Sequence, residues 1–204
     1  MLTVPLLMDL AATIRPGVSR STVAENTAKL TDDGDLRKVT RGLWLNCCLV
    51  EPAPFAEAAP YVRKGAFASL QTVLGDSGVF HNYTLGVVCV VAQSPDSPTS
   101  LEPFVSDNGT CFEFFAIPKG ILLAPDPADL FAGQAYPCAT NEAALCHWIY
   151  LGRQVPFDVD LDIFDMERAV RVAESMGISE AFQAWAETAN FDFDKMDGAP
   201  PSCF

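Results

Sequence analysis

Hydrophobic positions recur at helical spacing in two stretches near the start of the chain. From residue 4 to residue 14 they fall at three- and four-residue steps, which predicts an amphipathic helix ended by the Pro-Gly break of residues 15–17. A second stripe predicts a helix over residues 20–31, with Ser19 as its N-cap and the acidic, glycine-ended residues 32–34 as its end. The pattern predicts a helix, a turn and a second helix.

Two short β-prone segments follow, at residues 36–39 and 43–45, on either side of Thr40-Arg41-Gly42. This is the pattern of a β-hairpin with a basic residue at its tip. Helix, turn, helix and ribbon is the element order of a winged helix-turn-helix, which we expect over residues 1–50. A complete winged helix has three helices before its wing, and only two are readable here. Either the first helix is missing, or residues 1–14 combine the roles of two helices.

The predicted second helix carries side chains suited to DNA. Its first turn would enter the major groove, where backbone N–H groups and small hydroxyl side chains suit phosphates. Arg20 suits guanine and Asn26 suits adenine. We expect DNA contacts from this helix and from the basic residues of the ribbon, namely Arg20, Ser21, Thr22, Asn26, Lys29, Lys38 and Arg41. The alternative is a helical hairpin and ribbon used only for protein contacts, with these charges as an ordinary solvated surface.

The rest of the chain mixes strand and helix patterns. Residues 51–60 are rich in Pro and Ala, which predicts a linker to a body at residues 61–204. The fold class we expect is α+β, with a winged helix-turn-helix head and a small α+β body that ends in a helical region. The body is expected to contain strands at residues 85–92, 111–117 and 121–124, and helices at residues 66–75 (capped by Ser69), 141–151, 166–176 and from 179 onward.

Charge is distributed unevenly along the chain. The 204 residues carry a formal net charge of −13, and the sequence pI is near 4.4. Residues 1–46 hold six basic and five acidic side chains, net +1, so residues 47–204 hold seven basic and 21 acidic ones, net −14. An acidic surface repels polyanions, which excludes nucleic acid as a partner of the body but not of the head. The acidic body points to a protein partner with a basic face, or serves solubility alone.

The seven cysteines form no C-x-x-C spacing, and with only two histidines no zinc motif is present. An odd number of thiols, most of them in apolar runs, favours a reducing cytoplasm. The apolar start has no basic segment before it and contains Asp9, so we expect neither a signal peptide nor a membrane span. The expected protein is cytoplasmic, holds no metal or cofactor, and binds operator DNA either as a homodimer on paired half-sites or in tandem.

Three patterns resemble catalytic or metal sites without matching them. Gly75-Asp76-Ser77-Gly78 follows an amphipathic helix, where Gly and Ser act as stop residues. Cys146 and His147 are neighbours on a predicted helix and point about 100° apart, so they do not form a nucleophile–base pair with each other; we expect His147 to be partly buried. The aspartates between residues 158 and 165 lack the glycine and final glutamate of an EF-hand, which favours a solvated linker and N-cap acids. We expect no catalytic site and no enzyme activity.

The head sequence resembles that of the AbiEi-type antitoxins. Residues 19–23, 30–36 and 39–46 are similar, in order, to that family's recognition helix, its L-x-x-x-G-x-L segment, and its basic wing with the R-G-x-aromatic-x-N sequence. Residues 66–74 and 136–145 resemble two later helices of the family. The chain departs from the family in having alanine at position 143, where the family has a basic residue, and in its acidic body, since the family's body is often basic.

The resemblance implies a head that binds operator DNA and represses its own operon, and a body that counters a nucleotidyltransferase-like toxin encoded next to it. It implies a transcriptional regulator and antitoxin of a type IV toxin–antitoxin system. Two alternatives stay open: an orphan regulator of the same architecture without a toxin, and a protein-interaction module that does not bind DNA. The second alternative predicts that reversing the charges of Arg20 and Arg41 leaves activity unchanged.

Overall fold

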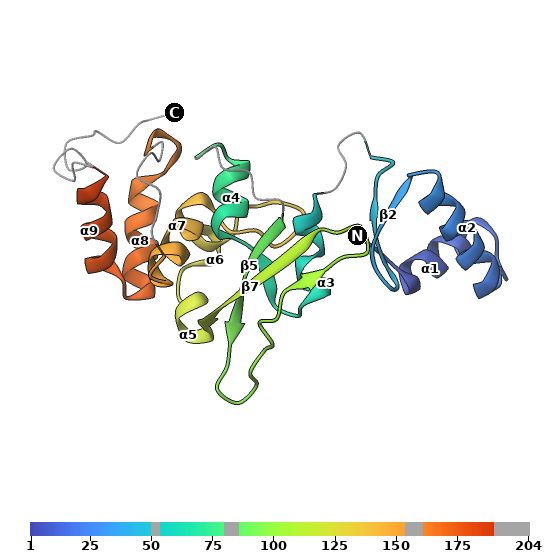
Figure 1. Ribbon diagram of the computed structural model, residues 1–204, viewed down its shortest axis with the longest axis horizontal. Coiled ribbons are helices and arrows are strands. Elements are labelled where there is room, and N and C mark those ends of the chain that lie inside the picture. The colour runs from blue at the N-terminus through green and yellow to red at the C-terminus, as the bar shows by residue number, and fades with distance from the viewer. Residues whose placement is uncertain (50–53, 80–85, 154–160, 190–204) are drawn as a thin grey trace.

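A computed structural model describes residues 1–49, 54–79, 86–153 and 161–189 (Figure 1). The molecule is elongated, with the first two helices at one end, a four-stranded sheet in the middle and the last two helices at the other end. Helices and strands are mixed along the chain, and the sheets contain both antiparallel and parallel pairs. The expected α+β class is confirmed.

The N-terminal elements follow the predicted order. Helices α1 (Val4–Ile14) and α2 (Arg20–Asp32) precede the hairpin of β2 (Leu36–Thr40) and β3 (Leu43–Asn46). A short strand that was not predicted, β1 (Leu2–Thr3), pairs with β3 and completes an antiparallel sheet of order β1-β3-β2. The two predicted helices and the predicted hairpin are confirmed.

Local chemistry sets the ends of α2 and the turn of the hairpin. The hydroxyl of Ser19 accepts a hydrogen bond of 3.2 Å from the backbone N–H of Thr22, which confirms Ser19 as the N-cap. Gly34 follows the C-cap Asp33 at φ +85°, and Gly42 turns the hairpin at φ +81°. These left-handed conformations are strained for residues with a Cβ atom, so glycine is required there.

One face of the hairpin is buried in the core of the body, and the other is partly covered by the N-terminal helices. Val39, Leu43 and Leu45 are at most 5% exposed and belong to the same apolar core as the body. Trp44 points to the opposite face, as alternation along a strand requires, and is half-buried in the wall of a groove that residues of α1 and α2 also line. The hairpin therefore lies between the two N-terminal helices and the body and forms part of both (Figure 1).

The prediction of a linker at residues 51–60 is wrong for residues 55–60, which are helical. Residues 50–53 lie outside the described residues. A 3-10 helix (η1, Phe55–Ala58) runs directly into α3 (Ala59–Val62). Three alanines, Ala56, Ala58 and Ala59, are at most 3% exposed and join the core. Alanine side chains let this segment approach closely, and Pro60 is tolerated in a first helical turn because its missing N–H has no partner there.

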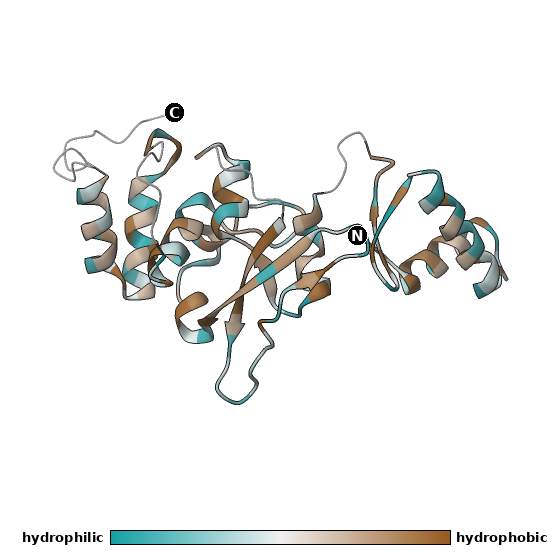
Figure 2. Cartoon of the chain, in the orientation of Figure 1, coloured by the Kyte–Doolittle hydropathy of each residue, from teal (hydrophilic) through white to brown (hydrophobic). Residues whose placement is uncertain are grey.

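The body is built on a sheet of order β4-β5-β7-β6. Strands β5 (Gly86–Gln93) and β7 (Cys111–Pro118) run parallel at its centre, and this confirms two predicted strands. Both strands are largely hydrophobic, as Figure 2 shows; β5 is buried on both of its faces, whereas one face of β7 carries the exposed Glu113 and the half-buried Phe115. The outer strands β4 (Ala66–Ala68) and β6 (Phe104–Val105) are short and antiparallel to their neighbours.

Two predicted elements of the body are corrected. The helix expected at residues 66–75 begins only at α4 (Leu70–Asp76), because residues 66–68 are the strand β4, paired with Cys89–Val91 of β5. The strand expected at residues 121–124 is instead the short helix α5 (Lys119–Leu122). Apolar runs of three or four residues fit either structure, and the burial partner decides between them.

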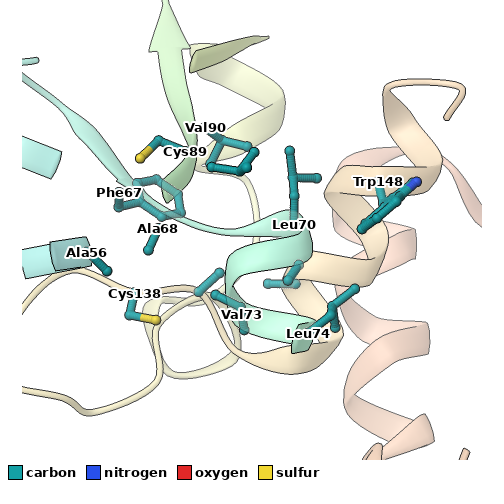
Figure 3. Packing of buried hydrophobic residues seen from close by; sticks show 14 of the residues in the cluster. Ala56, Phe67, Ala68, Leu70, Val73, Leu74, Cys89, Val90, Cys138 and Trp148 are labelled. Atoms are coloured by element: carbon teal, nitrogen blue, oxygen red, sulfur yellow. The ribbon is translucent and has the colours of Figure 1, made fainter. Parts of the chain in front are cut away.

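The C-terminal part is helical, as predicted. Helix α7 packs against α4, and α8 and α9 pack on α7 and on each other. In Figure 3, Leu70, Val73 and Leu74 of α4 lie near Ala68 of β4 and Cys138, with Trp148 of α7 beyond them. Burial of these apolar side chains is the main stabilising term of the fold. The bounds are α6 Pro127–Leu130, α7 Asn141–Tyr150, η2 Leu161–Ile163, α8 Met166–Met176 and α9 Ser179–Thr188.

Candidate nucleic-acid interface

One face of α2 presents a polar surface to solvent. Ser21 and Lys29 lie in one row with Glu25, at four-residue spacing, and Thr22 and Asn26 form the adjacent row. All of these side chains are exposed except that of Thr22, which is half-buried and shares a hydrogen bond with Ser19. Four of the seven predicted DNA-binding residues are thus brought together on one helix face, around the carboxylate of Glu25.

Arg20 lies apart from that face. It is exposed, but it lines a groove between α1, α2 and the hairpin together with Val23 and Thr27, three and seven residues further along the helix. This groove has a volume of about 440 Å³, and its other walls include Leu7 of α1 and Trp44 of β3. The helix itself separates Arg20 from Asn26 and Lys29, although the sequence places them within one short stretch.

Arg41 occupies the exposed tip of the hairpin, beside Gly42. Within the part of the chain that the structure describes, Arg20, Lys29 and Arg41 take part in no ion pair. Their charges are therefore free to meet an external anion, and phosphate is the anion that cationic side chains on a DNA-facing surface neutralise.

Lys38 is in a different position, because it is held by the body. Its ammonium lies 2.6 Å from Oδ2 of Asp107, which follows β6, and the backbone N–H of Asp107 donates to the carbonyl of Val39 at 3.0 Å. The guanidinium of Arg37 lies 5.5 Å from the ring centre of Phe55. The basic side chains in the middle of β2 thus contact the body, in contrast to the one at the hairpin tip.

Acidic side chains limit where a polyanion can approach. Asp32, Asp33 and Asp35 cluster at the C-terminal end of α2, where the helix dipole is also negative. The N-terminal end has no acidic residue in its first turn, and the backbone N–H groups of Arg20 and Ser21, unlike that of Thr22, do not bond to the Ser19 cap. An approaching phosphate chain is therefore favoured at the start of α2 and at Arg41, and is repelled at the end of α2.

A buried pair in the body was not predicted as a pair. The hydroxyl of Ser69 lies 2.8 Å from Nδ1 of His147, and both residues are 0% exposed. Burial lowers the pKa of His147 to about 3, so the imidazole is neutral at physiological pH. His147 is thus fully rather than partly buried, and Ser69 makes this bond instead of the predicted helix cap. The pair ties α7 to the junction of β4 and α4 and is sealed from substrates.

The structure shows the roles of the residues whose sequence patterns resemble catalytic or metal sites. Ser77 is the C-cap of α4, and Gly78 follows at φ +75°, which confirms that Gly75–Gly78 ends a helix. Asp165 is the N-cap of α8 and accepts from the N–H of Arg168 at 3.0 Å, as predicted, whereas residues 158 and 160 lie outside the described residues. No group of three His, Cys, Asp or Glu side chains among the described residues is arranged to hold a metal ion.

Ion pairs in the body join α6 and α7 to α8. The guanidinium of Arg171 donates to both carboxylate oxygens of Asp129, at 2.9 and 3.1 Å, and this hydrogen bonding holds the pKa of Asp129 below its usual value. The side chain of Glu142 is buried, accepts from the N–H of Asp165 at 2.9 Å and lies 3.5 Å from Arg168. These acidic residues have internal structural partners.

No family model matches the chain, and no curated protein matches it. Among solved structures, the chain is similar to the crystal structure of the protein RV2827C from Mycobacterium tuberculosis, with a TM-score of 0.47 and 15% sequence identity over 94% of this chain and 77% of that one. No helix among the described residues combines the length and the apolar character needed to cross a membrane.

Proposed function

We propose that residues 1–49 form a winged helix-turn-helix that binds operator DNA, and that the chain is the transcriptional regulator and antitoxin of a type IV, AbiE-like toxin–antitoxin system. The observation that carries the DNA-binding part is the polar face of α2, with Asn26 and Lys29, next to a hairpin whose tip is the unpaired Arg41. The order β1, α1, α2, β2, β3 supports this proposal, because helix, turn, helix and ribbon is the element order expected of a winged helix-turn-helix.

Each side chain has a distinct part in this interface. Asn26 suits a bidentate contact to adenine, while Ser21 and Thr22 and the first N–H groups of α2 suit phosphates. Arg41 reaches the sugar-phosphate backbone or the minor groove next to the site. Arg20 contacts DNA only at the rim of α2, because it lies on the groove side of the helix. Lys38 contributes only if its ion pair with Asp107 opens.

The small number of free cations sets the strength of binding. Three of the predicted DNA-binding residues, Arg20, Lys29 and Arg41, are basic and take part in no ion pair among the described residues, and neutralisation of about three phosphates by them gives a slope of log K against log salt of about −3. We therefore expect modest affinity that salt weakens further, and a need for two heads on one operator. A mobility-shift assay with the promoter of the protein's own operon tests this part, with a scrambled duplex as the control. Absence of salt-sensitive retardation at micromolar protein would contradict DNA binding. It would support the alternative that the chain is a protein-interaction module.

The antitoxin part rests on the resemblance and on the acidic body, which fits a partner with a basic face. Exposed carboxylates line the outer helices, at Glu167 and Glu174 of α8 and at Glu180 and Glu187 of α9. Co-expression of the full chain with the neighbouring nucleotidyltransferase-like gene product tests the role through rescue of growth. Reversal of these four charges to lysine is expected to abolish rescue and to leave operator binding unchanged. Failure of the wild-type chain to rescue growth would contradict the antitoxin role and support the alternative of an orphan regulator.

A further inference from the structure

The groove between α1, α2 and the hairpin has the size and the lining of a small-molecule site. Its volume of about 440 Å³ lies within the range of about 300–1,000 Å³ that such sites have. One stripe of α2 forms a wall along the whole helix, and α1 and the hairpin form the other walls (Figure 1). The apolar side chains in these walls include Val4, Leu7 and Met8 of α1, Val23 and Ala28 of α2, and Trp44 of β3.

The shape of the groove matches a single extended chain. Arg20 and Asp32 both line it and are the first and last residues of α2, which places them about 18 Å apart along the helix. Spread over this length, the volume corresponds to a mean cross-section of about 24 Å², against roughly 80 Å² for a helix about 10 Å across. The groove therefore accommodates one alkyl chain but not a helix of a partner protein.

The polar side chains in the middle of the groove are already bonded. The hydroxyl of Thr27 donates to the carbonyl of Val23, and the hydroxyl of Thr31 donates to the carbonyl of Thr27, both at 2.8 Å. The ammonium of Lys38 is paired with Asp107. A hydrocarbon chain in this part of the groove therefore leaves none of these donors without a partner, which is the condition for apolar burial at low cost.

The two ends of the groove differ in charge. Arg20 takes part in no ion pair within the described part of the chain, and it lies at the N-terminal end of α2, where the helix dipole is positive. Asp32 lies at the opposite end, next to Asp33 and close in sequence to Asp35. An anionic group is thus attracted to one end and repelled from the other. A guanidinium suits a carboxylate in particular, through two parallel hydrogen bonds.

We propose that this groove binds a medium-chain fatty acid, with the carboxylate on Arg20 and the alkyl chain along α2 toward Thr31. The chain covers Leu7 and Trp44 and removes their half-exposed apolar surface from water, which is the main favourable contribution to binding. An extended acid of about ten carbons fits the length of about 18 Å between the two ends. A ligand of this size gives a dissociation constant on the order of 100 µM.

The bound acid also affects DNA binding, and this part rests on the proposed function. Arg20 is one of the three predicted DNA-binding cations without an ion pair, together with Lys29 and Arg41. A carboxylate that occupies its guanidinium removes one cation from the DNA-binding surface. Promoter affinity then falls, and the slope of log K against log salt decreases by about one in magnitude. The fatty acid thus acts as an inducer that relieves repression.

Isothermal titration calorimetry of the full chain with decanoate, in the absence of DNA, tests the proposal. The expected result is saturable binding of one decanoate per chain, weakened at least about tenfold in Arg20→Gln. Lys119→Gln on α5 removes the same charge outside the groove and is the matched control, expected to bind as wild type does. Decylammonium, which has the opposite charge, and acetate, which lacks the alkyl chain, are expected not to bind. Circular dichroism checks that both variants are folded.

Four results would overturn the proposal. They are absence of saturable decanoate binding up to about 2 mM, an Arg20→Gln chain that binds like wild type, an equal loss in Lys119→Gln, and binding of decylammonium or acetate as strong as that of decanoate. A chain that binds decanoate but not promoter DNA would contradict the proposed function and support the site. A chain that binds both, with a promoter affinity that decanoate does not change, would contradict the coupling between them.

Discussion

Asp107 holds Lys38 through an ion pair of 2.6 Å, and its backbone N–H bonds to the carbonyl of the next residue, Val39. The loop after β6 thereby reaches the strand that leads to the hairpin tip. Since Val39 also lies in the shared core, the orientation of the hairpin is set by the body. The body thus controls one basic side chain that the sequence assigned to DNA.

Asp107→Asn is expected to release Lys38. The neutral side chain no longer competes with phosphate, so affinity for promoter DNA rises about two- to fivefold and the slope of log K against log salt becomes steeper by about one. Stability changes by less than about 1 kcal/mol, because the pair is half-exposed. Fluorescence anisotropy at several salt concentrations measures both quantities. Asp96→Asn, in the loop after β5, is the control; an equal gain there would assign the effect to net charge alone.

Leu45→Ala is expected to loosen the N-terminal helices and the body together. Leu45 is 1% exposed in the shared core, so its truncation removes about 2–5 kcal/mol from the free energy of unfolding. Urea denaturation followed by tryptophan fluorescence measures the loss. Leu49→Ala, at a 52% exposed position, is the control and is expected to change stability by less than about 0.5 kcal/mol. Equal effects of the two changes would contradict the burial of Leu45 in the shared core.

Acidification is expected to destabilise the fold through His147. The unfolded chain binds a proton on this imidazole near pH 6.5, whereas the folded chain does so only near pH 3. Between these values the unfolded state holds more protons, so stability falls as pH decreases, by about 1.4 kcal/mol per pH unit from this group. Above pH 6.5 its contribution is constant. Urea denaturation at several pH values from 7.5 to about 4.5 measures the slope.

His147→Gln separates this histidine from the other titrating groups. Glutamine is neutral at every pH and can hydrogen-bond to Ser69, so the variant is expected to be less stable at pH 7.5 but to lose stability less steeply below pH 6.5. The slope, not the absolute stability, is the readout. Identical pH dependence of the two chains would contradict the buried neutral state of His147.

Glu25 is expected to weaken DNA binding, because its carboxylate lies in the row between Ser21 and Lys29. Glu25→Gln should raise affinity for all duplexes by about two- to tenfold, as removal of a charge near phosphates does.

Asn26→Ala should instead reduce the preference for the promoter over a scrambled duplex, by about 1–3 kcal/mol. Competition assays distinguish the two effects. A uniform loss of affinity in Asn26→Ala would place Asn26 on phosphate and not on a base.

Capping residues, glycine stops and apolar spacing in the sequence predicted the helices and strands whose ends they determine. The Ser19 cap, the Gly34 stop and the apolar stripe of α2 are encoded within a few residues, so sequence pattern located this helix and the following hairpin. The strand at 66–68 and the helices at 55–62 were missed because their state depends on distant partners. Ala66–Ala68 pairs with β5, and the alanines of η1 and α3 fit against the shared core.

The same distinction applies to the candidate interface. Sequence spacing predicted that Ser21, Asn26 and Lys29 lie on one helix, and helical periodicity places them on its exposed side. Spacing did not show that Lys38 is paired with Asp107, 69 positions away, or that Ser69 meets His147. Contacts over such separations depend on the tertiary fold, and no local pattern in the sequence marks them.

Salt-dependent binding of the full chain to its own promoter tests the central claim most directly. The account predicts salt-sensitive, promoter-selective binding with a slope of log K against log salt of about −3 for each head, which decreases by about one in magnitude in Arg41→Gln and is unchanged in the control Lys119→Gln. Lys119 lies on α5, distant from α2 in Figure 1. Binding that is absent, insensitive to salt, or equally affected by both substitutions would contradict the account.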